Sequence, residues 1–369
     1  MAKQELVDQV LWGQYRNRIR TRTVRELDPK SGMTPESWQR CDVLQVSTFD
    51  LHMAGMVSEF EPVPADLCKI ASACFAPEVL EQCCSHDGQL MMLPIITNPT
   101  VCYAHRPAFE KAGLALPLAG WSWPTFVETC RTLRASHERP LGLFPVSGLT
   151  FEPMMWAHDC DYFDAIGGVS LPRESFHRSM SLLRELLNEQ LCVDMYELLH
   201  TPWDYLRSGN ICLTFMGPDL TRTLGDALPD WSLVPLPHNG SPVTPVVVFG
   251  LVVPRGQADT DRIWDLLRDM FADGRFSALG EVSKIFPAHI DGQHRWAGNG
   301  VQNANIMRQS LEHSRFLPAR KGFMRWVMPV YRILTQVMHG ETDIEIARCE
   351  IRRLLQESRI HRHDLLAIT

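Results

Sequence analysis

The chain has 369 residues, a length that suits two domains of ordinary size better than one compact core. Hydrophobic residues make up 45% and charged residues 21% of the sequence, which argues against a disordered, collagen-like or coiled-coil chain. With 36 basic and 43 acidic residues the formal net charge is −7, and this balance does not favour a nucleic-acid-binding surface, which needs clustered positive charge.

The first half of the chain predicts short strands between helices. In chain order we expect a helix at Gln4–Gln14, strands at Arg18–Val24 and Asp42–Ser47, a pair of strands at Leu90–Pro94 and Pro99–Ala104, and helices at Phe109–Leu114 and Val127–Ala135. The two paired strands would meet around Thr97 and Asn98. Pro124 precedes the last of these helices, where its first turn tolerates a proline.

The second half alternates in the same way. Its predicted elements are helices at Phe176–Gln190 and Thr201–Ser208, strands at Ile211–Phe215 and Pro245–Pro254, and helices at Thr260–Ala272, Phe323–His339 and Ile344–Arg359. We expect the Val-rich strand Pro245–Pro254 to be interrupted at Phe249 and Gly250. Helices alternating with short buried strands favour an α/β architecture.

The sequence leaves the cellular compartment open. No apolar run reaches the roughly 18 residues of a membrane-spanning helix, and Met1–Gln9 lacks the basic-then-apolar order of a secretion signal. Eleven cysteines are an odd number, and most lie in apolar segments where a free thiol behaves as a small hydrophobe. This usage suggests a reducing, cytoplasmic compartment.

Signals for an enzyme or a metal site are weak. The chain has no phosphate-binding glycine loop, nucleophile elbow or zinc-protease motif. Cys83–Asp87 has zinc-ligand residue types, but adjacent cysteines chelate one ion poorly, so we interpret it as a surface turn. Asp159–Asp164 has alternating acids but lacks the glycine and glutamate of a calcium loop, so we expect a ligand-facing loop. The sequence predicts no catalytic residue, no metal ligand and no cofactor.

Eight segments, taken in order, carry a resemblance to a known family. They are Asp42–Asp50, Gly88–Pro94, Thr97–Gly113, Trp121–Phe126, Leu206–Pro218, Trp231–Pro237, Val247–Pro254 and Gly340–Ala347. Together they resemble the extracellular solute-binding protein family 1, the ABC-transporter sugar-binding proteins of the maltose- and glycerol-phosphate-binding kind. The resemblance covers roughly residues 5 to 360.

Two features depart from the family pattern. Ala104-His105-Arg106 stands where the family usually has Tyr-Asn-Lys, and the family's first strand is missing before Gln4. Because such a strand lies inside the sheet, its loss would leave backbone groups unpaired, and we therefore expect that upstream residues are absent.

The resemblance implies an α/β, two-lobed periplasmic-binding-protein-like (type II) fold with hinge crossovers. Lobe one would comprise residues 1–101 plus 248–298, and lobe two residues 102–247 plus 299–369. A ligand would lie between the lobes and be enclosed when they close. The crossovers would lie near Val101–Tyr103, Val246–Phe249 and Gly298.

The resemblance also implies a site for a sugar or polyol, whose C–H faces pack on aromatic rings and whose hydroxyls pair with polar groups. The expected ligand-binding residues are Asp50, Asn98, Trp156, Gly217, Phe249, Gly250 and Arg320. Asp50 and Asn98 would bond hydroxyls, Trp156 would stack, and the glycines would let the backbone approach the ligand. Competing interpretations are helix capping by Asp50 and a plain strand-ending turn at Gly217.

Three functions follow from these observations. The first is a non-enzymatic carbohydrate-binding component of an ABC importer, whose partners are a small-molecule ligand and the transporter's membrane subunits. The second is a cytosolic ligand sensor fused behind a DNA-binding domain, which the cysteines and the missing first strand favour. The third is a metal-dependent enzyme at Cys83–Asp87 or Asp159–Asp164.

Overall fold

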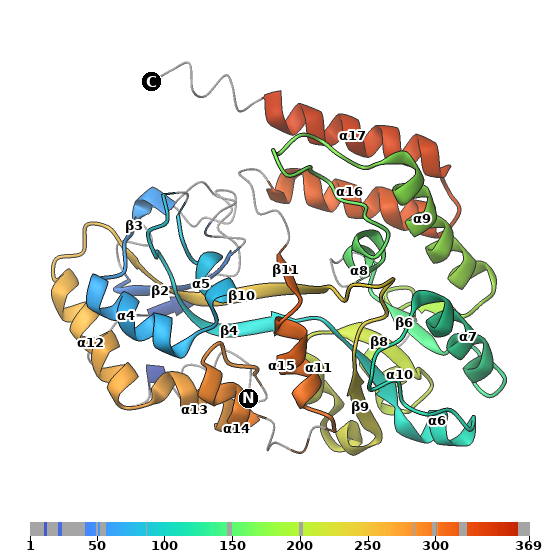
Figure 1. Ribbon diagram of the computed structural model, residues 1–369, viewed down its shortest axis with the longest axis horizontal. Coiled ribbons are helices and arrows are strands. Elements are labelled where there is room, and N and C mark those ends of the chain that lie inside the picture. The colour runs from blue at the N-terminus through green and yellow to red at the C-terminus, as the bar shows by residue number, and fades with distance from the viewer. Residues whose placement is uncertain are drawn as a thin grey trace. The chain divides into compact units, whose positions relative to one another are not determined.

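The structure is a computed structural model of the chain. It describes residues 11–12, 21–23, 41–48, 51, 57–85, 87–145, 150–198, 202–282, 285–296, 300, 302–316 and 323–360. The chain forms two compact units: unit 1 is Met1–Asn98, Val246–Gly300 and Ala319–Lys321, and unit 2 is Pro99–Pro245, Val301–Pro318 and Gly322–Thr369. Both units contain helices and a sheet (Figure 1).

The sheet of unit 1 is organised around one long strand. Its strands are β1 (Thr21–Thr23), β2 (Val43–Ser47), β3 (Phe60–Glu61), β4 (Leu93–Pro99) and β10 (Thr244–Pro254), and β11 (Ser314–Phe316) of unit 2 continues the order β1-β2-β10-β11. β1 runs parallel to β2, whereas β10 is antiparallel to both β2 and β3. β4 also pairs with β10. β2 therefore has a strand on each edge.

The longest helix of unit 1, α12 (Thr260–Ala272), is amphipathic and buries its apolar side. The other helices of this unit are α4 (Ala65–Cys74), α5 (Pro77–Glu81), α13 (Arg275–Val282) and α14 (Ile290–Trp296), with a short 3-10 turn at Val57–Glu59. α12 starts at the cap Asp259, whose side chain accepts from the N–H of Arg262, and it buries Ile263, Leu267 and Met270. α12, α13 and α14 follow one another along one side of this unit (Figure 1).

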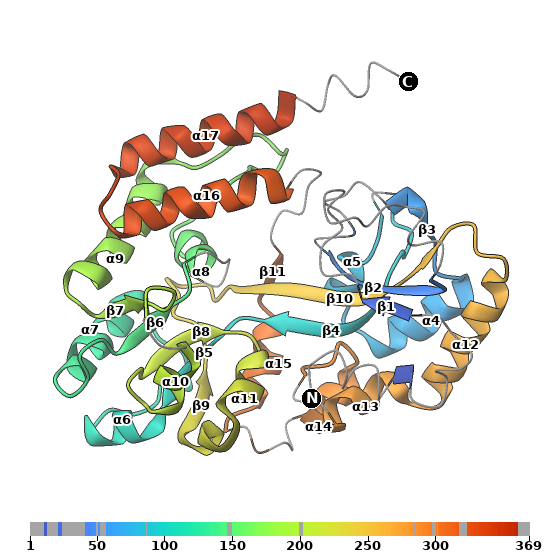
Figure 2. The same ribbon diagram turned by 180° about the vertical axis from the view of Figure 1, so that it is seen from behind.

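Unit 2 is built on a five-stranded mixed sheet. Its strands are β5 (Val101–His105), β6 (Leu141–Leu143), β7 (Cys192–Asp194), β8 (Leu213–Met216) and β9 (Trp231–Val234), in the order β7-β6-β8-β5-β9 (Figure 2). β6 is parallel to both β7 and β8, and β5 is antiparallel to β8 and β9. Most residues of these strands are buried, and two of the five, β5 and β8, lie where the sequence predicts strands.

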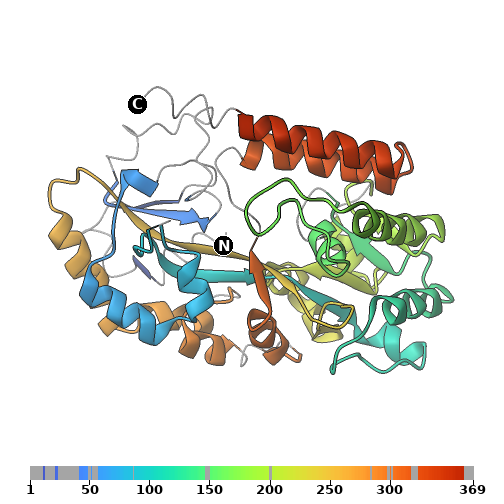
Figure 3. The same ribbon diagram turned by 45° about the horizontal axis from the view of Figure 1, so that its top comes forward.

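The helices of unit 2 include a packed group of three. The helices are α6 (Arg106–Lys111), α7 (Trp123–Arg134), α8 (Phe151–Trp156), α9 (Arg173–Asn188), α10 (Pro202–Arg207), α11 (Asp219–Leu224), α15 (Asn305–Leu311), α16 (Phe323–Met338) and α17 (Ile344–Ile360), with a 3-10 helix at Gly225–Asp230. α9, α16 and α17 pack against one another (Figure 3). α7 is capped by Ser122 and has Pro124 in its first turn, as predicted.

Two sequence predictions about strands are wrong. The predicted pair Leu90–Pro94 and Pro99–Ala104 does not form, because β4 runs straight through Thr97 and Asn98 to Pro99 and pairs with β10, while β5 pairs with β8 and β9. The predicted interruption of β10 is also absent. Phe249 and Gly250 lie in register opposite β2, so the ladder holds them extended.

Part of the predicted N-terminal region lies outside the described residues. Of the expected helix Gln4–Gln14 only residues 11 and 12 are described, and of the expected strand Arg18–Val24 only β1 is described. Within the described part of the chain, no helix has the length and apolar character needed to cross a bilayer. The chain passes from one unit to the other within β4, within β10, after Gly300 and on either side of Ala319–Lys321.

Candidate functional site

Asn98, the expected hydroxyl partner on β4, has a free acceptor. Its Oδ1 is buried and has no hydrogen-bond partner among the described residues. The neighbouring backbone is occupied, because the N–H of Thr97 donates to the carbonyl of Phe286 at 3.1 Å and that of Thr100 to the carbonyl of Pro245 at 2.9 Å. A buried amide oxygen left unpaired costs about 1–3 kcal/mol, so Asn98 is suited to accept from a ligand hydroxyl.

Phe249 and Gly250 lie side by side in β10, opposite Ser47 and Val46 of β2. A Cβ atom on Gly250 would lie 2.6 Å from the carbonyl oxygen of Leu93, so glycine is required here for the close approach of β4. Phe249 is half-buried. Packing against β4 is sufficient to explain the glycine, and the approach of a ligand at this position stays a prediction.

Trp156, the expected stacking residue, ends α8 and is only 5% exposed. The guanidinium carbon of Arg315 lies 4.7 Å from the centre of its ring, and an ion pair with Asp161 holds Arg315 in place. The indole Nε1 is buried with no hydrogen-bond partner among the described residues. The indole N–H is therefore available to a ligand oxygen, whereas stacking of a sugar would need the ring face that Arg315 leaves open.

Gly217 follows β8 and begins the turn into α11. Its carbonyl accepts a hydrogen bond from the hydroxyl of Tyr103 at 3.1 Å. Tyr103 is buried in β5, and burial raises its pKa well above the usual value, so the hydroxyl stays protonated and donates. The structure thus gives Gly217 a role in the sheet, and its role toward a ligand stays a prediction.

A buried carboxyl that the sequence analysis missed lies one helical turn before Trp156. Oε1 of Glu152 accepts from the hydroxyls of Tyr162 at 3.0 Å and Tyr331 at 2.9 Å, while Oε2 is buried without a partner in the described part of the chain. Burial raises the pKa of Glu152 to about 7, although the two tyrosine hydrogen bonds oppose this rise. The signal in the sequence was a single acid inside the apolar segment Phe151–Trp156.

The two segments considered for metal binding are held by local hydrogen bonds. The thiols of Cys83 and Cys84 donate to the carbonyls of Val79 and Leu80 in the preceding helix. In the acidic loop, Oδ1 of Asp164 accepts from the N–H of Ile166 at 3.1 Å and from that of the nearby Gly168. These groups stabilise turns, and the loop's orientation toward a ligand stays a prediction.

Asp50 and Arg320 lie outside the described residues, so the structure says nothing of their roles. The remaining predicted residues divide between the units. Asn98, Phe249 and Gly250 belong to unit 1, where β4 and β10 bring them onto paired strands, and Trp156 and Gly217 belong to unit 2.

The overall architecture matches many solved structures. An ABC substrate-binding protein from Listeria monocytogenes in complex with cycloalternan aligns with a TM-score of 0.79 and 15% identity, covering 96% of this chain and 95% of that chain. Maltose-bound MalE3 from T. maritima aligns with a TM-score of 0.79 and 13% identity, covering 96% of each. UgpB from Mycobacterium tuberculosis, in complex with glycerophosphocholine, aligns with a TM-score of 0.74 and 14% identity, covering 96% of this chain and 95% of that chain. This chain has the solute-binding-protein fold.

The match shows the fold and leaves the ligand to be determined, because the identities are 13–15%. No protein-family model matches the sequence, and no curated protein matches it. The expected two-lobed, periplasmic-binding-protein-like architecture is confirmed, since both this chain and its neighbours are covered over nearly their full length. Of the three neighbours, the Listeria protein is described as an ABC substrate-binding protein, and MalE3 and UgpB are described with maltose and glycerophosphocholine bound.

Proposed function

We propose that this protein binds a carbohydrate or similar polyol reversibly, without chemical change, as the substrate-binding component of an ABC importer. The observation that carries the proposal is the near full-length likeness in fold to solved structures that contain bound cycloalternan, maltose and glycerophosphocholine. These ligands share several hydroxyl or ether oxygens, which a binding protein recognises through convergent hydrogen bonds.

Two unpartnered polar atoms support a hydroxyl-rich ligand. Asn98 of unit 1 offers a buried acceptor and Trp156 of unit 2 a buried donor, and neither has a hydrogen-bond partner in the described residues. A sugar hydroxyl both donates and accepts, so one ligand with several hydroxyls would satisfy both groups. We therefore propose Asn98 and Trp156 as the principal ligand contacts.

A thermal-shift screen against sugars, polyols and their phosphates tests the proposal. A ligand that binds only the folded protein stabilises it by RT ln(1 + L/Kd), which is about 2.7 kcal/mol when the free ligand concentration L is one hundred times Kd. We expect at least one compound to raise the melting temperature in a concentration-dependent way. If no hydroxyl-rich compound shifts the transition, while an unrelated class such as amino acids does, the proposed ligand class is wrong.

Matched variants locate the site. Trp156→Ala should abolish the ligand-induced shift while the ligand-free protein still folds, whereas Trp203→Ala, a half-buried tryptophan stacked on Phe144, should retain it. Asn98→Ala should weaken binding by about tenfold or more, and Asn210→Ala, at an exposed asparagine, should not. Full binding by the Trp156→Ala protein would remove that residue from the site without excluding a binding function.

The importer role requires the protein to act on the outer side of a membrane, and its thiols make this testable. All eleven cysteines are free, and Cys68, Cys74 and Cys84 are half-buried while Cys349 is exposed. Fractionation of the source cells, with alkylation of thiols at lysis, would report both compartment and oxidation state. Protein on the outer side of the membrane would support the importer role, whereas protein confined to the cytoplasm would overturn that role and leave ligand binding intact.

A further inference from the structure

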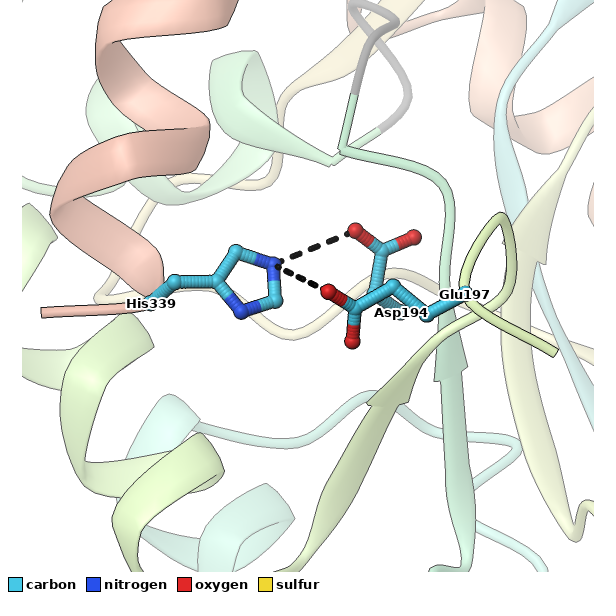
Figure 4. A group of neighbouring side chains, drawn as sticks. All are labelled: Asp194, Glu197 and His339. Carbon is cyan, nitrogen blue, oxygen red and sulfur yellow. Dashed lines mark hydrogen bonds and ion pairs between the residues drawn. The ribbon is translucent and has the colours of Figure 1, made fainter. Parts of the chain in front are cut away.

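A group of three potential metal ligands lies in unit 2, separate from the residues discussed above. Figure 4 shows Asp194, Glu197 and His339 pointing toward one another. Nε2 of His339 is 3.3 Å from Oδ2 of Asp194 and 3.7 Å from Oε1 of Glu197. The three ligand atoms all lie within 4.8 Å of one another.

The carboxylate side of this group is fixed by a tight turn. Asp194 ends β7, its Oδ1 accepts from the N–H of Tyr196 at 2.8 Å, and its carbonyl accepts from the N–H of Glu197 at 3.1 Å. Because Oδ1 is occupied by the backbone, Oδ2 is the atom left to face His339. The turn therefore presents one oxygen from each acid to the same point.

The histidine side is fixed by the end of α16. His339 directly follows this helix, and its N–H still donates to the carbonyl of Thr335 at 3.0 Å. The hydroxyl of Thr335 donates to the carbonyl of Tyr331 at 2.8 Å and also lies 3.4 Å from the carbonyl oxygen of Pro145, two residues beyond β6. The opposite side of the group is tied to the end of the same strand, because the N–H of Met195 donates to the carbonyl of Leu143 at 2.9 Å. The segments that carry His339 and Asp194 thus both contact residues at or just after the end of β6, within unit 2.

The electrostatics of this position favour a cation. The side chain of Asp194 is only 5% exposed, yet its ion-pair partner among the described residues is His339 alone, with no lysine or arginine. Glu197 adds a second negative charge, and the last carbonyls of α16 contribute the negative end of the helix dipole. A divalent ion at this position would neutralise both carboxylates, of which that of Asp194 is 5% exposed and that of Glu197 62% exposed.

The spacing and the ligand types point to a transition metal. Zn–N and Zn–O bonds of about 2.0–2.1 Å place the ligand atoms of a tetrahedral site about 3.3–3.5 Å apart. The distances from Nε2 of His339 to the two carboxylate oxygens, 3.3 and 3.7 Å, are close to this range. An imidazole together with carboxylates suits zinc, cobalt or manganese better than calcium or magnesium, which prefer oxygen ligands alone. We propose that Asp194, Glu197 and His339 bind one divalent transition-metal ion, with zinc the best fit and a fourth position open to solvent beside the 62%-exposed Glu197.

Metal titration of EDTA-treated protein tests this site. We expect one Co²⁺ per chain in equilibrium dialysis, with a visible spectrum that lacks the intense sulfur-to-metal charge-transfer band of cysteine ligation, and displacement by one equivalent of Zn²⁺. The spectrum matters because the chain also has eleven free thiols that could bind metal elsewhere.

Three variants make the result decisive. Glu197→Gln and His339→Gln should each weaken binding at this site at least tenfold, whereas Glu341→Gln, which removes an exposed acid two residues from His339, should leave it unchanged. Glu197 is exposed, so its variant should fold normally, and its metal-free melting curve verifies this. Three outcomes would show that the group is only an ion pair. They are unchanged metal binding by both variants, a spectrum typical of thiolate ligands, and no stoichiometric binding at all. Sugar binding is measured separately, so this outcome would not affect the proposed function.

Discussion

The two units differ in what their cores contain. Among the described residues, the buried polar side chains of unit 1 are all uncharged, whereas unit 2 buries two carboxylates, Glu152 and Asp194. Each of the two meets a partner far away in the sequence: Tyr331 lies 179 residues from Glu152, and His339 lies 145 residues from Asp194. Unit 1 is thus held mainly by apolar packing and close backbone approach, and unit 2 also by buried polar contacts whose strength depends on protonation.

This difference predicts that the pH dependence of stability resides in unit 2. Below pH 4.5, the usual pKa of a glutamate, Glu152 is protonated in both the folded and the unfolded chain. Between 4.5 and about 7 the unfolded chain loses this proton while the folded chain keeps it, so the free energy of unfolding falls as the pH rises. The raised pKa corresponds to a loss on the order of 3 kcal/mol by pH 8.

The variant Glu152→Gln should remove this slope. Its stability relative to the unmodified protein should improve by on the order of 3 kcal/mol between pH 4 and pH 8, as measured by urea unfolding at a series of pH values. Comparing the two proteins at each pH cancels the titration of every other group. A constant difference between them across this range would show that Glu152 ionises normally in the folded protein.

A second prediction compares two strand glycines, one in each unit. A Cβ on Gly250 of unit 1 would lie 2.6 Å from the backbone carbonyl of Leu93, which cannot move without disturbing β4. A Cβ on Gly142 of unit 2 would meet the side chains of Met195, with Sδ at 2.6 Å, and Ile211 at 3.1 Å, which can adjust. We expect Gly250→Ala to cost about 2–3 kcal/mol and Gly142→Ala about 1 kcal/mol in unfolding experiments. Equal losses of stability would contradict the view that a backbone contact at Gly250 tolerates an added methyl group less well than the side-chain contacts at Gly142 do.

A third prediction concerns the arginine over Trp156. Arg315→Gln removes both the cation–π contact and the ion pair with Asp161, and we expect a loss of about 1 kcal/mol in stability. Isothermal titration of the same variant with the hydroxyl-rich ligand found in the screen should show altered affinity, because a ring face of Trp156 becomes uncovered. An unchanged affinity would indicate that the ligand touches only the indole N–H or a different residue.

The smallest expected effect is at an exposed charge network in the same unit. Arg131 of α7 donates to Glu185 and Glu189 of the α9 region at 2.7–2.8 Å, but all three side chains are 38–45% exposed. Water screens such pairs, so Arg131→Gln should lower the stability only slightly, and the loss should shrink further in 1 M salt. A larger, salt-independent loss would place Arg131 among the structural residues of unit 2.

Several helices and buried strands could be predicted because each has a local pattern, whereas the helix Ala65–Cys74 and the short strands Leu141–Leu143 and Cys192–Asp194 were not predicted. The helix Thr260–Ala272 has the predicted bounds, since its cap and its apolar stripe are both local in sequence. The strand around Thr97 and Asn98 could not be predicted in the same way. Those residues are typical of turns, but the backbone N–H of Thr97 is held by Phe286, a residue far along the chain, and that contact keeps β4 extended.

The candidate site was only partly predictable for the same reason. Trp156 and Asn98 were proposed from a family resemblance, and the structure adds that each has a buried polar atom without a partner in its described part. Glu152 and the group around His339 were missed, because a lone acid or histidine has no meaning in a sequence until the fold supplies its neighbours. Periodicity predicts which face of a helix is buried, but not which distant polar group lies opposite it.

The helix α16 carries both of these distant partners. Tyr331 meets Glu152, and His339, just past the helix end, meets Asp194. The two positions are eight residues apart, about 12 Å along a helix axis. Any displacement of α16 along its axis would therefore change the hydrogen-bonding partners of both acids, so a single substitution that shifts this helix would alter two separate buried carboxyls.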